Sequence, residues 1–362
     1  MMNKQLEFMD KAIAIAETGR GKTSPNPFVG CVIVKDGKQI GEGVTQKCGS
    51  DHAEIQALKK AGANSQGAEM YVTLEPCCFQ GRTPACSLAI IKAGISKVHI
   101  GIRDPNPRVN GEGIAQLKKA GIAVEEGFRS EEIAEQLEYY LTNMKKQRPF
   151  VILKSAMTLD GYIAGEDGSS KWITGERSRQ KVHTLRSEVD AIITGIGTVL
   201  NDDPQLNNRN EGEWHQPMRV VLDSNLRIPI TSKLAESAMN QKTLVFCSAS
   251  ASGEKAAKLT ESGIEVIVMQ NNEVDLREML QELYSRGISV LMLEAGEGVV
   301  SSFEREGLID KYLFFIAPQI LGNGKRVISL PEHSSMSERH LLQYRSVERI
   351  GEDLLITAYH KV

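Results

Sequence analysis

The sequence predicts an α/β protein with two domains, and three observations support this fold class. A chain of 362 residues is longer than one typical hydrophobic core supports. Apolar segments of strand length alternate with amphipathic helical segments, as in sheets that helices cover on both faces. The polar segment KKQRPF, residues 145–150, interrupts this alternation. We therefore expect one domain over residues 1–147 and a second over residues 148–362.

The elements expected in the first half begin with an amphipathic helix that carries Leu6, Met9 and Ile13. A hairpin follows around the turn Asp36-Gly37. The other elements are a helix at 53–62, a strand at 69–75, a helix at 86–94, a strand at 97–102, and helices at 113–121 and 131–146. This order predicts a mostly parallel sheet with helices on both faces.

The second half repeats the alternation of strands and helices. Strand candidates lie at 150–164, 191–195, 219–224, 243–250, 265–270, 289–296 and 311–320. A helix is expected at 276–287, and a last strand at 354–362 is expected to close the sheet at an edge. We detect no internal repeat and no low-complexity segment.

The composition excludes several classes of protein. Hydrophobic and charged contents of 41% and 25% are those of a globular protein, and a net charge of −3 with scattered cations disfavours a nucleic-acid partner. The first residues lack the apolar core of a signal peptide, and no run approaches the roughly 18 apolar residues of a membrane span. Six unevenly spaced cysteines indicate thiols or metal ligands rather than disulfides. We expect a cytoplasmic protein without a membrane segment.

A zinc site is predicted in the first domain from the order of His52, Cys77 and Cys86. Catalytic zinc sites use three protein ligands and leave the fourth position to water. His52 and Cys86 are both expected at helix starts, where partial positive charge favours a thiolate. Glu54 is not needed as a ligand, so it is available to take a proton from the zinc-bound water and pass it to a leaving amine. The order matches the H-x-E and P-C-x-x-C signature of zinc nucleobase deaminases, except that eight residues separate Cys77 from Cys86.

Other interpretations of these residues stay open. Two cysteines nine positions apart are also typical of small buried hydrophobic side chains. A structural zinc site needs a fourth ligand, for which Cys78 is the candidate, although neighbours in an extended segment point in opposite directions. A deaminase that acts on RNA or DNA needs a cationic surface, which the net charge does not favour.

The motifs of the whole chain together resemble the bifunctional riboflavin-biosynthesis family, in which a pyrimidine deaminase is fused to a reductase. The segments that carry the resemblance are, in order, TSPNPFVGCVIVKDG, HAE, TLEPC, GRTPAC, RDPNPRVNGEG, LKSAMTLDGYIA, SKWITG, TVLNDDP and EAGEG. It implies an N-terminal three-layer α/β/α domain like that of cytidine deaminases and a C-terminal α/β domain like dihydrofolate reductase. It also implies a homo-oligomer, a dimer or a tetramer.

The resemblance implies two reactions on a small pyrimidine ribosyl-phosphate. The first is zinc-dependent hydrolytic deamination of 2,5-diamino-6-(5-phosphoribosylamino)pyrimidin-4-one to 5-amino-6-(5-phosphoribosylamino)uracil. The second is reduction of the ribosyl group to ribityl by NADPH. In the first domain the resemblance assigns the zinc to His52, Cys77 and Cys86, the proton shuttle to Glu54, the pyrimidine to Asn26 and the substrate phosphate to Arg82.

Three residues depart from the pattern of this family. Cys78 and Phe79 stand where many members have Ser and His, and Thr45 stands where relatives commonly have another His. No zinc ligand is altered, so the departures concern substrate contacts in the deaminase pocket. They also motivate an alternative function, a monofunctional reductase whose first domain keeps zinc for structure or assembly.

The second domain gives weaker signals when its residues are considered alone. Residues 290–303 form a strand, a glycine turn and a helix start that could bind phosphate, but they lack the full dinucleotide fingerprint. Taken alone, Trp172 is interpreted as a core aromatic residue. Lys154 and Glu294 are polar residues on otherwise apolar strands, where a site would place them. No residue is assigned as proton donor to the opened sugar, because the hydride comes from the cofactor and the protein orients the reactants.

The resemblance implies two sets of contacts in this domain. NADPH is expected to lie across the carboxyl edge of the sheet, at Ala156, Trp172, Thr198, Asp202, Ser224, Gly296, Glu297, Gly298, Val299, Val300, Ser301 and Ser302. The ribosyl-phosphate substrate is expected at Lys154, Ser170, Arg186, Leu206, Arg209 and Glu294. Arginines suit a phosphate dianion because they bind it with two parallel hydrogen bonds, which supports Arg186 and Arg209.

Overall fold

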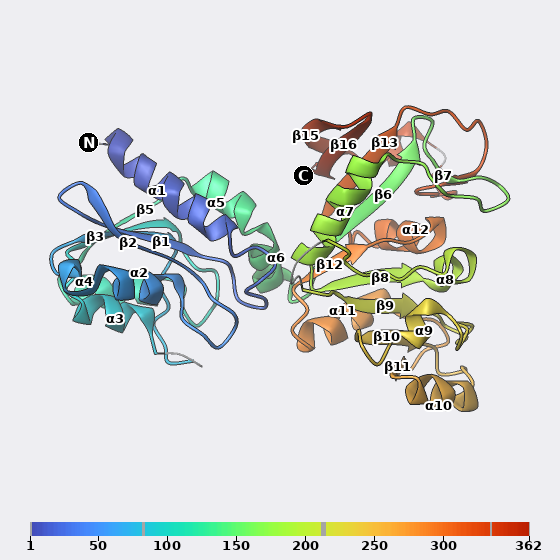
Figure 1. Ribbon diagram of the computed structural model, residues 1–362, viewed down its shortest axis with the longest axis horizontal. Helices are drawn as coiled ribbons and strands as arrows, with labels where there is room; N and C mark the ends of the chain where they lie inside the picture. Colours follow the sequence, from blue (N-terminus) through green and yellow to red (C-terminus); the bar gives the residue numbers. More distant parts are fainter. Residues whose placement is uncertain (1, 82–83, 211–214, 334, 362) are drawn as a thin grey trace. The chain divides into compact units, whose positions relative to one another are not determined.

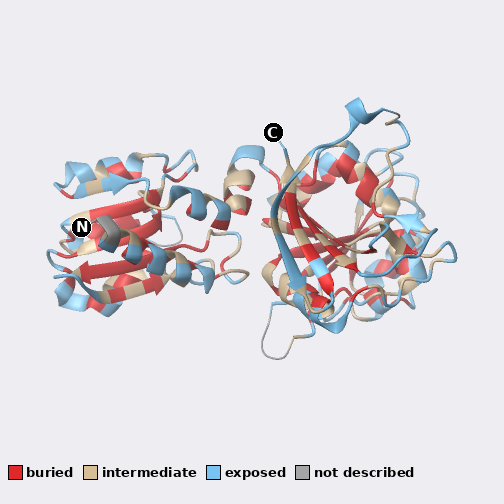
Figure 2. Ribbon diagram, turned by 90° about the horizontal axis from the view of Figure 1, so that it is seen from above, coloured by how far each residue is buried: buried red, intermediate tan, exposed pale blue. Residues whose placement is uncertain are grey.

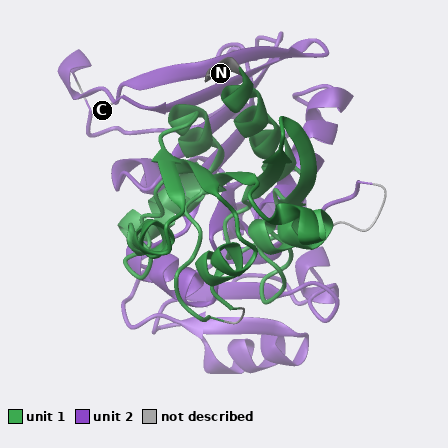
Figure 3. Cartoon of the chain, turned by 90° about the vertical axis from the view of Figure 1, so that its left-hand side faces the viewer, with its two compact units in different colours: residues 1–147 green, residues 148–362 purple. Residues whose placement is uncertain are grey.

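The computed structural model describes residues 2–81, 84–210, 215–333 and 335–361, and the chain divides into two compact units of residues 1–147 and 148–362 (Figure 3). Each unit contains a main sheet of its own, so the predicted α/β class is confirmed. Within the described ranges, no helix combines the length and the apolar character that a membrane crossing requires. None of the six cysteines, all of which lie in the described ranges, forms a disulfide, as expected from their spacing.

The sheet of the first unit has five strands in the order β2-β1-β3-β4-β5. Their bounds are β1 Gly30–Lys35, β2 Lys38–Val44, β3 Glu69–Leu74, β4 Lys97–Ile102 and β5 Ala123–Glu126. β1 pairs antiparallel with β2 and with β3, whereas β3, β4 and β5 run parallel. Four of the five strands therefore run in one direction, as a mostly parallel sheet requires, and β1 alone of the described strands of this sheet runs against both of its neighbours.

Helices cover both faces of this sheet, which gives the unit three layers (Figure 1). A Cβ on Gly30 of β1 would lie 1.9 Å from the Ala12 carbonyl oxygen of the first helix, so only glycine allows this approach. A Cβ on Gly43 of β2 would likewise lie 2.2 Å from the Ala53 carbonyl oxygen of the second helix. The helices are α1 Met2–Glu17, α2 Ala53–Ala61, η1 Gly62–Ser65, α3 Cys86–Lys92, α4 Glu112–Lys119, α5 Ser130–Gln136 and α6 Glu138–Lys146.

Two elements of the first unit differ from the sequence prediction. The single helix predicted over residues 131–146 is wrong, because Leu137 leaves helical geometry (φ −102°, ψ 17°) and separates α5 from α6. Leu137 is fully buried, so the chain turns about a core side chain. Strand β5 was not predicted, since its four residues AVEE are too short and too polar to show a strand pattern.

The main sheet of the second unit has nine strands in the order β11-β10-β9-β8-β12-β6-β13-β16-β15. Their bounds are β6 Phe150–Thr158, β8 Ala191–Gly195, β9 Met218–Leu222, β10 Thr243–Cys247, β11 Ile264–Val268, β12 Val290–Leu293, β13 Lys311–Ala317, β15 Leu342–Ile350 and β16 Asp353–His360. Neighbours from β11 to β13 run parallel, and β16 and β15 are antiparallel to the strands they join. A separate two-stranded sheet pairs β7 Tyr162–Ala164 with β14 Lys325–Arg326.

The prediction that the last strand closes this sheet at an edge is wrong. β16 lies between β13 and β15, and β15 forms the edge. The residues of β15, LQYRSVERI, are mostly exposed, so they lack the apolar run by which the other strands were recognised.

The central strands of this sheet are buried (Figure 2), and alternate residues of its parallel strands enter two different apolar clusters. Leu244 and Phe246 of β10 belong to one apolar cluster, whereas Val245 and Cys247 belong to the other, as the two-residue period of a strand requires. The helices of this unit are α7 Glu176–Glu188, α8 Ile196–Asp202, α9 Lys233–Glu236, α10 Gly253–Glu261, α11 Leu276–Ser285, α12 Glu297–Arg305 and η2 Met336–Glu338. Because parallel strands end at one edge, β6, β8, β9 and β12 bring their carboxyl ends together.

Candidate active sites

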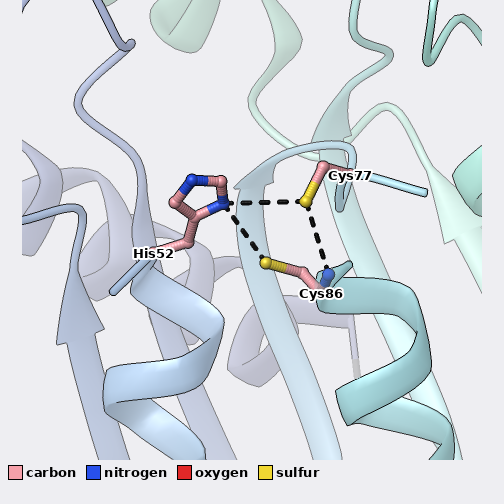
Figure 4. A group of neighbouring side chains, drawn as sticks. All are labelled: His52, Cys77 and Cys86. Atoms are coloured by element: carbon pink, nitrogen blue, oxygen red, sulfur yellow. Dashed lines mark hydrogen bonds between the residues drawn. The ribbon is translucent and has the colours of Figure 1, made fainter. Parts of the chain in front are cut away.

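Three potential metal ligands meet at the starts of helices α2 and α3 (Figure 4). The ligand atoms of His52, Cys77 and Cys86 all lie within 4.8 Å of one another. The Nδ1 atom of His52 is 3.7 Å from Cys77 Sγ and 3.3 Å from Cys86 Sγ. One imidazole nitrogen and two sulfurs are a donor set that zinc prefers. The three side chains therefore fit a zinc ion.

Local structure explains why these side chains converge. His52 is the N-cap residue of α2 and has an extended backbone (φ −76°, ψ 165°). Strand β3 ends at Leu74, and Cys77 follows in the loop after Pro76. Cys86 is the first residue of α3, and its backbone N–H donates a hydrogen bond to Cys77 Sγ at 3.3 Å. Both helix starts thus contribute a potential ligand, and the predicted placement of His52 and Cys86 at helix starts is confirmed. The N–H donor favours negative charge on Cys77.

The two thiols of this group hold their protons unequally. A hydrogen bond between the two side chains is the main cause that lowers the pKa of Cys77 to about 4, and the same side-chain bond raises the pKa of the Cys86 thiol. The hydrogen bond with Cys77 also raises the pKa of His52. The group thus already favours one thiolate, and a divalent cation held by all three residues would displace the proton of Cys86, since thiolates bind metals.

Glu54, the predicted proton shuttle, lies in the first turn of α2 and is buried. Burial, together with the negative charge of Cys77, raises the pKa of the Glu54 carboxyl to about 7. A hydrogen bond with Cys86 places this carboxyl beside the ligand group. A carboxyl group whose pKa is near neutrality is suited both to accept and to release a proton.

Glu75 supports the same region and was missed by the sequence analysis. Its buried carboxylate accepts backbone hydrogen bonds from Asp104 at 3.2 Å, Gly111 at 3.0 Å and Ile114 at 3.2 Å. It therefore ties the loop at residues 104–111 to the strand end that precedes Cys77. The available signal was an acidic residue directly after a buried strand, where an unpaired charge is not tolerated.

In the second unit, three of the residues predicted to bind substrate form a buried ionic cluster. The carboxylate of Glu294 accepts hydrogen bonds from Arg186 Nε at 2.8 Å and Nη2 at 3.0 Å, and Lys154 Nζ lies 3.6 Å from it. Burial alone would raise the pKa of Glu294, but the two cations outweigh it and lower the pKa to about 2. Burial lowers the pKa of Lys154. Two cations beside one carboxylate leave the cluster with an excess positive charge when all three are ionised, which suits an anionic substrate.

Leu206 and Arg209 lie in a segment that is tied to this cluster. Arg186 Nη1 donates to the Asn207 carbonyl at 3.0 Å. Arg209 Nε and Nη2 lie 3.3 Å and 3.2 Å from His183 Nε2. Burial and the two arginines lower the pKa of His183 to about 4, so the neutral imidazole accepts from Arg209. The sequence analysis missed His183, although it precedes Arg186 by three positions on α7, a spacing that places both on one helix face.

The start of α12 and the adjacent α8 form a second part of this site. Thr198 belongs to α8, which follows β8, and residues 296–302 begin α12, which follows β12 (Figure 1). β8 and β12 are neighbours, and a Cβ on Gly296 would lie 3.8 Å from Thr198 Oγ1. A Cβ on Gly197 or Gly298 would meet no atom within 4 Å, so open space lies at both helix starts. Two adjacent helix N-termini with open space fit the pyrophosphate of a dinucleotide.

Two other predicted contact residues, Ser170 and Trp172, lie in different surroundings. Ser170 Oγ donates to Asp202 Oδ1 at 3.1 Å, so the structure brings this pair together. Trp172 is 67% exposed, and the Arg179 guanidinium lies 4.7 Å from the centre of its ring. The interpretation of Trp172 as a core aromatic residue is therefore wrong.

Four further predicted cofactor residues, Ala156, Ser224, Val300 and Ser301, lie on different elements. Ala156 lies toward the carboxyl end of β6, and Ser224 follows β9, at the edge where α8 and α12 begin. The side chain of Val300 belongs to the sheet core, and Ser301 Oγ accepts the Ser329 N–H at 2.9 Å. The Val300 side chain is therefore not available to a cofactor, whereas the Ser301 hydroxyl still has its O–H to donate.

The matching proteins identify the family. Residues 149–356 match the family model described as RibD C-terminal domain, and residues 2–102 match the cytidine and deoxycytidylate deaminase zinc-binding region. The chain is 41% identical over 349 residues to riboflavin biosynthesis protein RibD of Aquifex aeolicus (strain VF5), with 96% of both chains covered. The chain belongs to the RibD family. The RibD protein of Bacillus amyloliquefaciens is 38% identical over 356 residues, which cover 98% of this chain and 96% of that one.

Solved structures of RibD proteins share the fold. Acinetobacter baumannii RibD, form 1, has a TM-score of 0.91 at 38% identity, with 100% of both chains covered. A diaminohydroxyphosphoribosylaminopyrimidine deaminase/5-amino-6-(5-phosphoribosylamino)uracil reductase from Thermotoga maritima has a TM-score of 0.88 at 36% identity, with 99% of both chains covered. The predicted resemblance is confirmed, as are the cytidine-deaminase-like and dihydrofolate-reductase-like folds. RibD membership makes this chain an enzyme of riboflavin biosynthesis with a zinc-dependent deaminase and an NADPH-dependent reductase.

Two of the departures from the RibD pattern contact the same residue. Cys78 Sγ donates to the Arg108 carbonyl at 3.3 Å, and the Arg108 guanidinium lies 3.8 Å from the centre of the Phe79 ring. Thr45 is buried, and its Oγ1 accepts the Val29 N–H at 3.1 Å. Because the Cys78 sulfur bonds elsewhere, the group of described ligands contains three protein residues and lacks the fourth that a structural zinc site requires.

The two predicted substrate residues of the RibD deaminase unit have different outcomes. Asn26 lies in the loop between α1 and β1, where its Oδ1 is 3.9 Å from Cys48 Sγ and its carbonyl accepts from Tyr139 Oη at 3.4 Å. Arg82 lies outside the described residues.

Proposed function

We propose that this chain catalyses two consecutive reactions on one pyrimidine ribosyl-phosphate. The first unit removes the 2-amino group of 2,5-diamino-6-(5-phosphoribosylamino)pyrimidin-4-one by hydrolysis and releases ammonia. The second unit reduces the ribosyl group of the resulting 5-amino-6-(5-phosphoribosylamino)uracil to ribityl. The observation that carries the proposal is the grouping of His52, Cys77 and Cys86 beside the buried Glu54. The name of the Thermotoga maritima relative supports both substrates.

In the proposed deaminase site, His52, Cys77 and Cys86 hold zinc. When bound, zinc supplies a Lewis acid that lowers the pKa of a water molecule. Glu54 accepts a proton from the water and donates one to the leaving amine, a transfer for which its raised pKa of about 7 is suited. Asn26 contacts the pyrimidine ring. Arg82 is proposed to bind the substrate phosphate.

In the proposed reductase site, the protein chiefly orients two reactants. Glu294 fixes the guanidinium of Arg186 and the ammonium of Lys154 in one place, so that the ribosyl-phosphate meets preformed positive charge. The other substrate contacts are Ser170, Leu206 and Arg209. NADPH supplies the hydride, and its proposed contacts are Ala156, Trp172, Thr198, Asp202, Ser224 and residues 296–302.

We further propose the organisation of the chain. The deaminase domain corresponds to residues 1–147 and the reductase domain to residues 148–362, which agrees with the two compact units. A homo-oligomer forms through the second unit, where the edge strand β15 exposes Tyr344 and Val347. The protein acts in the cytoplasm, a compartment that keeps thiols reduced, which fits the absence of disulfides among its six cysteines.

A two-stage assay on the purified full chain tests the proposed order of reactions. Without NADPH, the diaminopyrimidinone should release one ammonia per molecule. NADPH should then be oxidised only by the deaminated product. If the chain oxidised NADPH with the deaminated compound but released no ammonia from the diaminopyrimidinone, the monofunctional reductase would be favoured instead. Oxidation of NADPH by the diaminopyrimidinone itself would contradict the order of the two steps.

A further inference from the structure

An arginine on β9 is buried, and none of the acidic side chains that the structure describes forms an ion pair with it. Arg219 is 1% exposed and is the largest fully buried side chain among the described residues. Burial lowers the pKa of its guanidinium to about 10, so the group still carries its charge at neutral pH. Buried charges normally face an opposite charge, because an unpaired charge in an apolar surrounding is costly. A positive charge that is buried despite this energetic cost indicates that the guanidinium has a structural role.

The acceptors of Arg219 in the described part of the chain are all uncharged and come from separate segments. They are Thr243 Oγ1 at 2.9 Å from Nε and 2.6 Å from Nη2, Ser237 Oγ at 2.7 Å from Nη1, and the carbonyls of Gln205 at 3.4 Å, Leu234 at 3.1 Å and Gln241 at 2.9 Å. A planar guanidinium presents five N–H groups in a fixed fork, whereas an ammonium presents three on a flexible stem. Arg219 therefore joins β10, the α9 region and the segment at 205 in one rigid arrangement.

The segment at residues 205–209 is held by side chains along its whole length. Four consecutive backbone carbonyls of this segment each accept a hydrogen bond from a side chain. The Gln205 carbonyl accepts from Arg219 Nη1, and the Leu206 carbonyl accepts from Gln241 Nε2 at 3.3 Å. The Asn207 carbonyl accepts from Arg186 Nη1 at 3.0 Å, and the Asn208 carbonyl accepts from Gln216 Nε2 at 2.9 Å. Leu206 adopts a positive φ of 47°, a conformation that non-glycine residues rarely occupy unless their surroundings impose it. Arg209 Nη1 also donates a hydrogen bond to Gln205 Oε1 at 3.5 Å, within the same segment. The segment is thus preformed rather than shaped by a ligand.

We propose that Arg219 is a positioning residue of the reductase site, which fixes residues 205–209 so that the backbone at Leu206, whose side chain is buried in the core, and the side chain of Arg209 face the ribosyl-phosphate. The inference rests on the proposed function, in which Leu206 and Arg209 contact this substrate. Arg219 itself is buried and acts through the Gln205 carbonyl. Its contribution is the geometry of the segment, and a one-ångström error in such geometry is enough to weaken productive binding.

The test compares substrate binding with stability in the full-length chain. Arg219→Lys keeps a positive charge but loses the fork, so residues 205–209 should be misplaced. The reductase KM for 5-amino-6-(5-phosphoribosylamino)uracil should then rise by up to about 100-fold, the cost of an error of about one ångström in the position of a contact group. The Kd of the same compound, measured by calorimetry without NADPH, should rise equally. The KM for NADPH and the release of ammonia by the first unit should not change. A merely structural role would lower the melting temperature and the active fraction, and would leave both KM values unchanged.

Two further variants separate the alternatives. Gln241→Met removes the donor to the Leu206 carbonyl and should also raise the substrate KM, so it carries the test if Arg219→Lys does not fold. Leu280→Ala empties a fully buried position on α11 in the other core cluster and should lower stability without changing the substrate KM. A wild-type substrate KM in both Arg219→Lys and Gln241→Met would overturn the inference, as would an equal rise in Leu280→Ala. If the wild-type chain does not oxidise NADPH with this substrate, the proposed function fails instead.

Discussion

Replacing Glu294 with Gln isolates the charge of the buried cluster in the second unit. Gln keeps the size of the side chain and one acceptor for Arg186, but it removes the negative charge that faces Arg186 and Lys154. The three side chains are 10%, 13% and 15% exposed, so solvent screens them little. Breaking a buried ion pair by removing one partner typically costs about 3–5 kcal/mol. For a unit of this size, a loss of that order lowers the melting temperature by roughly 6–20 °C.

A matched control for this variant is an exposed ion pair in the same unit. Lys258 Nζ and Glu254 Oε1 are 2.7 Å apart on α10, but their side chains are 56% and 79% exposed. Glu254→Gln should therefore cost at most about 0.5 kcal/mol. Calorimetry of the full chain follows both variants, and activity assays should show that Glu294→Gln loses NADPH oxidation and keeps ammonia release. If Glu294→Gln and Glu254→Gln melted at the same temperature, the reasoning about buried charge would be refuted.

Three other outcomes are expected. Glu54→Gln should lower ammonia release by about 10²–10⁴-fold, the usual contribution of a general acid–base group, while zinc content and NADPH oxidation stay unchanged; equal loss of both activities would contradict separate sites. Gly30→Ala should destabilise the first unit by about 1–3 kcal/mol because its Cβ would overlap a helix carbonyl. The control is Gly253→Ala, whose Cβ would meet no atom within 4 Å, and this variant should unfold like the wild type. The folded pKa of Glu294 is lowered from 4.5 to about 2, so its stabilisation is complete above the unfolded value and is lost as the pH falls from 4.5 toward 2; acid unfolding should show this dependence in the wild type and lack it in Glu294→Gln.

The residues of the zinc group could be predicted because their chemistry is rare and their order is local. A His at one helix start and two Cys around the next strand and helix imply both the ligands and their approach, and the structure brings these three together. The strands with continuous apolar runs, such as residues 191–195, were equally recognisable, since burial on both faces leaves a clear signal. Strand β15 was missed for the opposite reason, because an exposed edge strand has no such run.

The supporting residues could not be predicted because their partners are distant in the sequence. Glu75 bonds to backbone groups 29 to 39 positions away. Arg186 and Glu294 were predicted as substrate residues from the family resemblance, but their contact with each other spans 108 positions and was not predicted. His183 and Arg219 belong to the same class: each is an ordinary residue of a helix or strand until the fold brings its acceptor or donor beside it. Periodicity reports which face of an element is buried, and it carries no information about which polar groups meet there.

Metal content and ammonia release, measured together, test the central claim most directly. The purified wild-type chain should hold about one zinc ion, the stoichiometry of a single three-ligand catalytic site. Cys77→Ser and Cys86→Ser should lose both the zinc and ammonia release while they continue to oxidise NADPH with the deaminated substrate. Full zinc content in either variant, or ammonia release by a metal-free wild-type chain, would contradict the account.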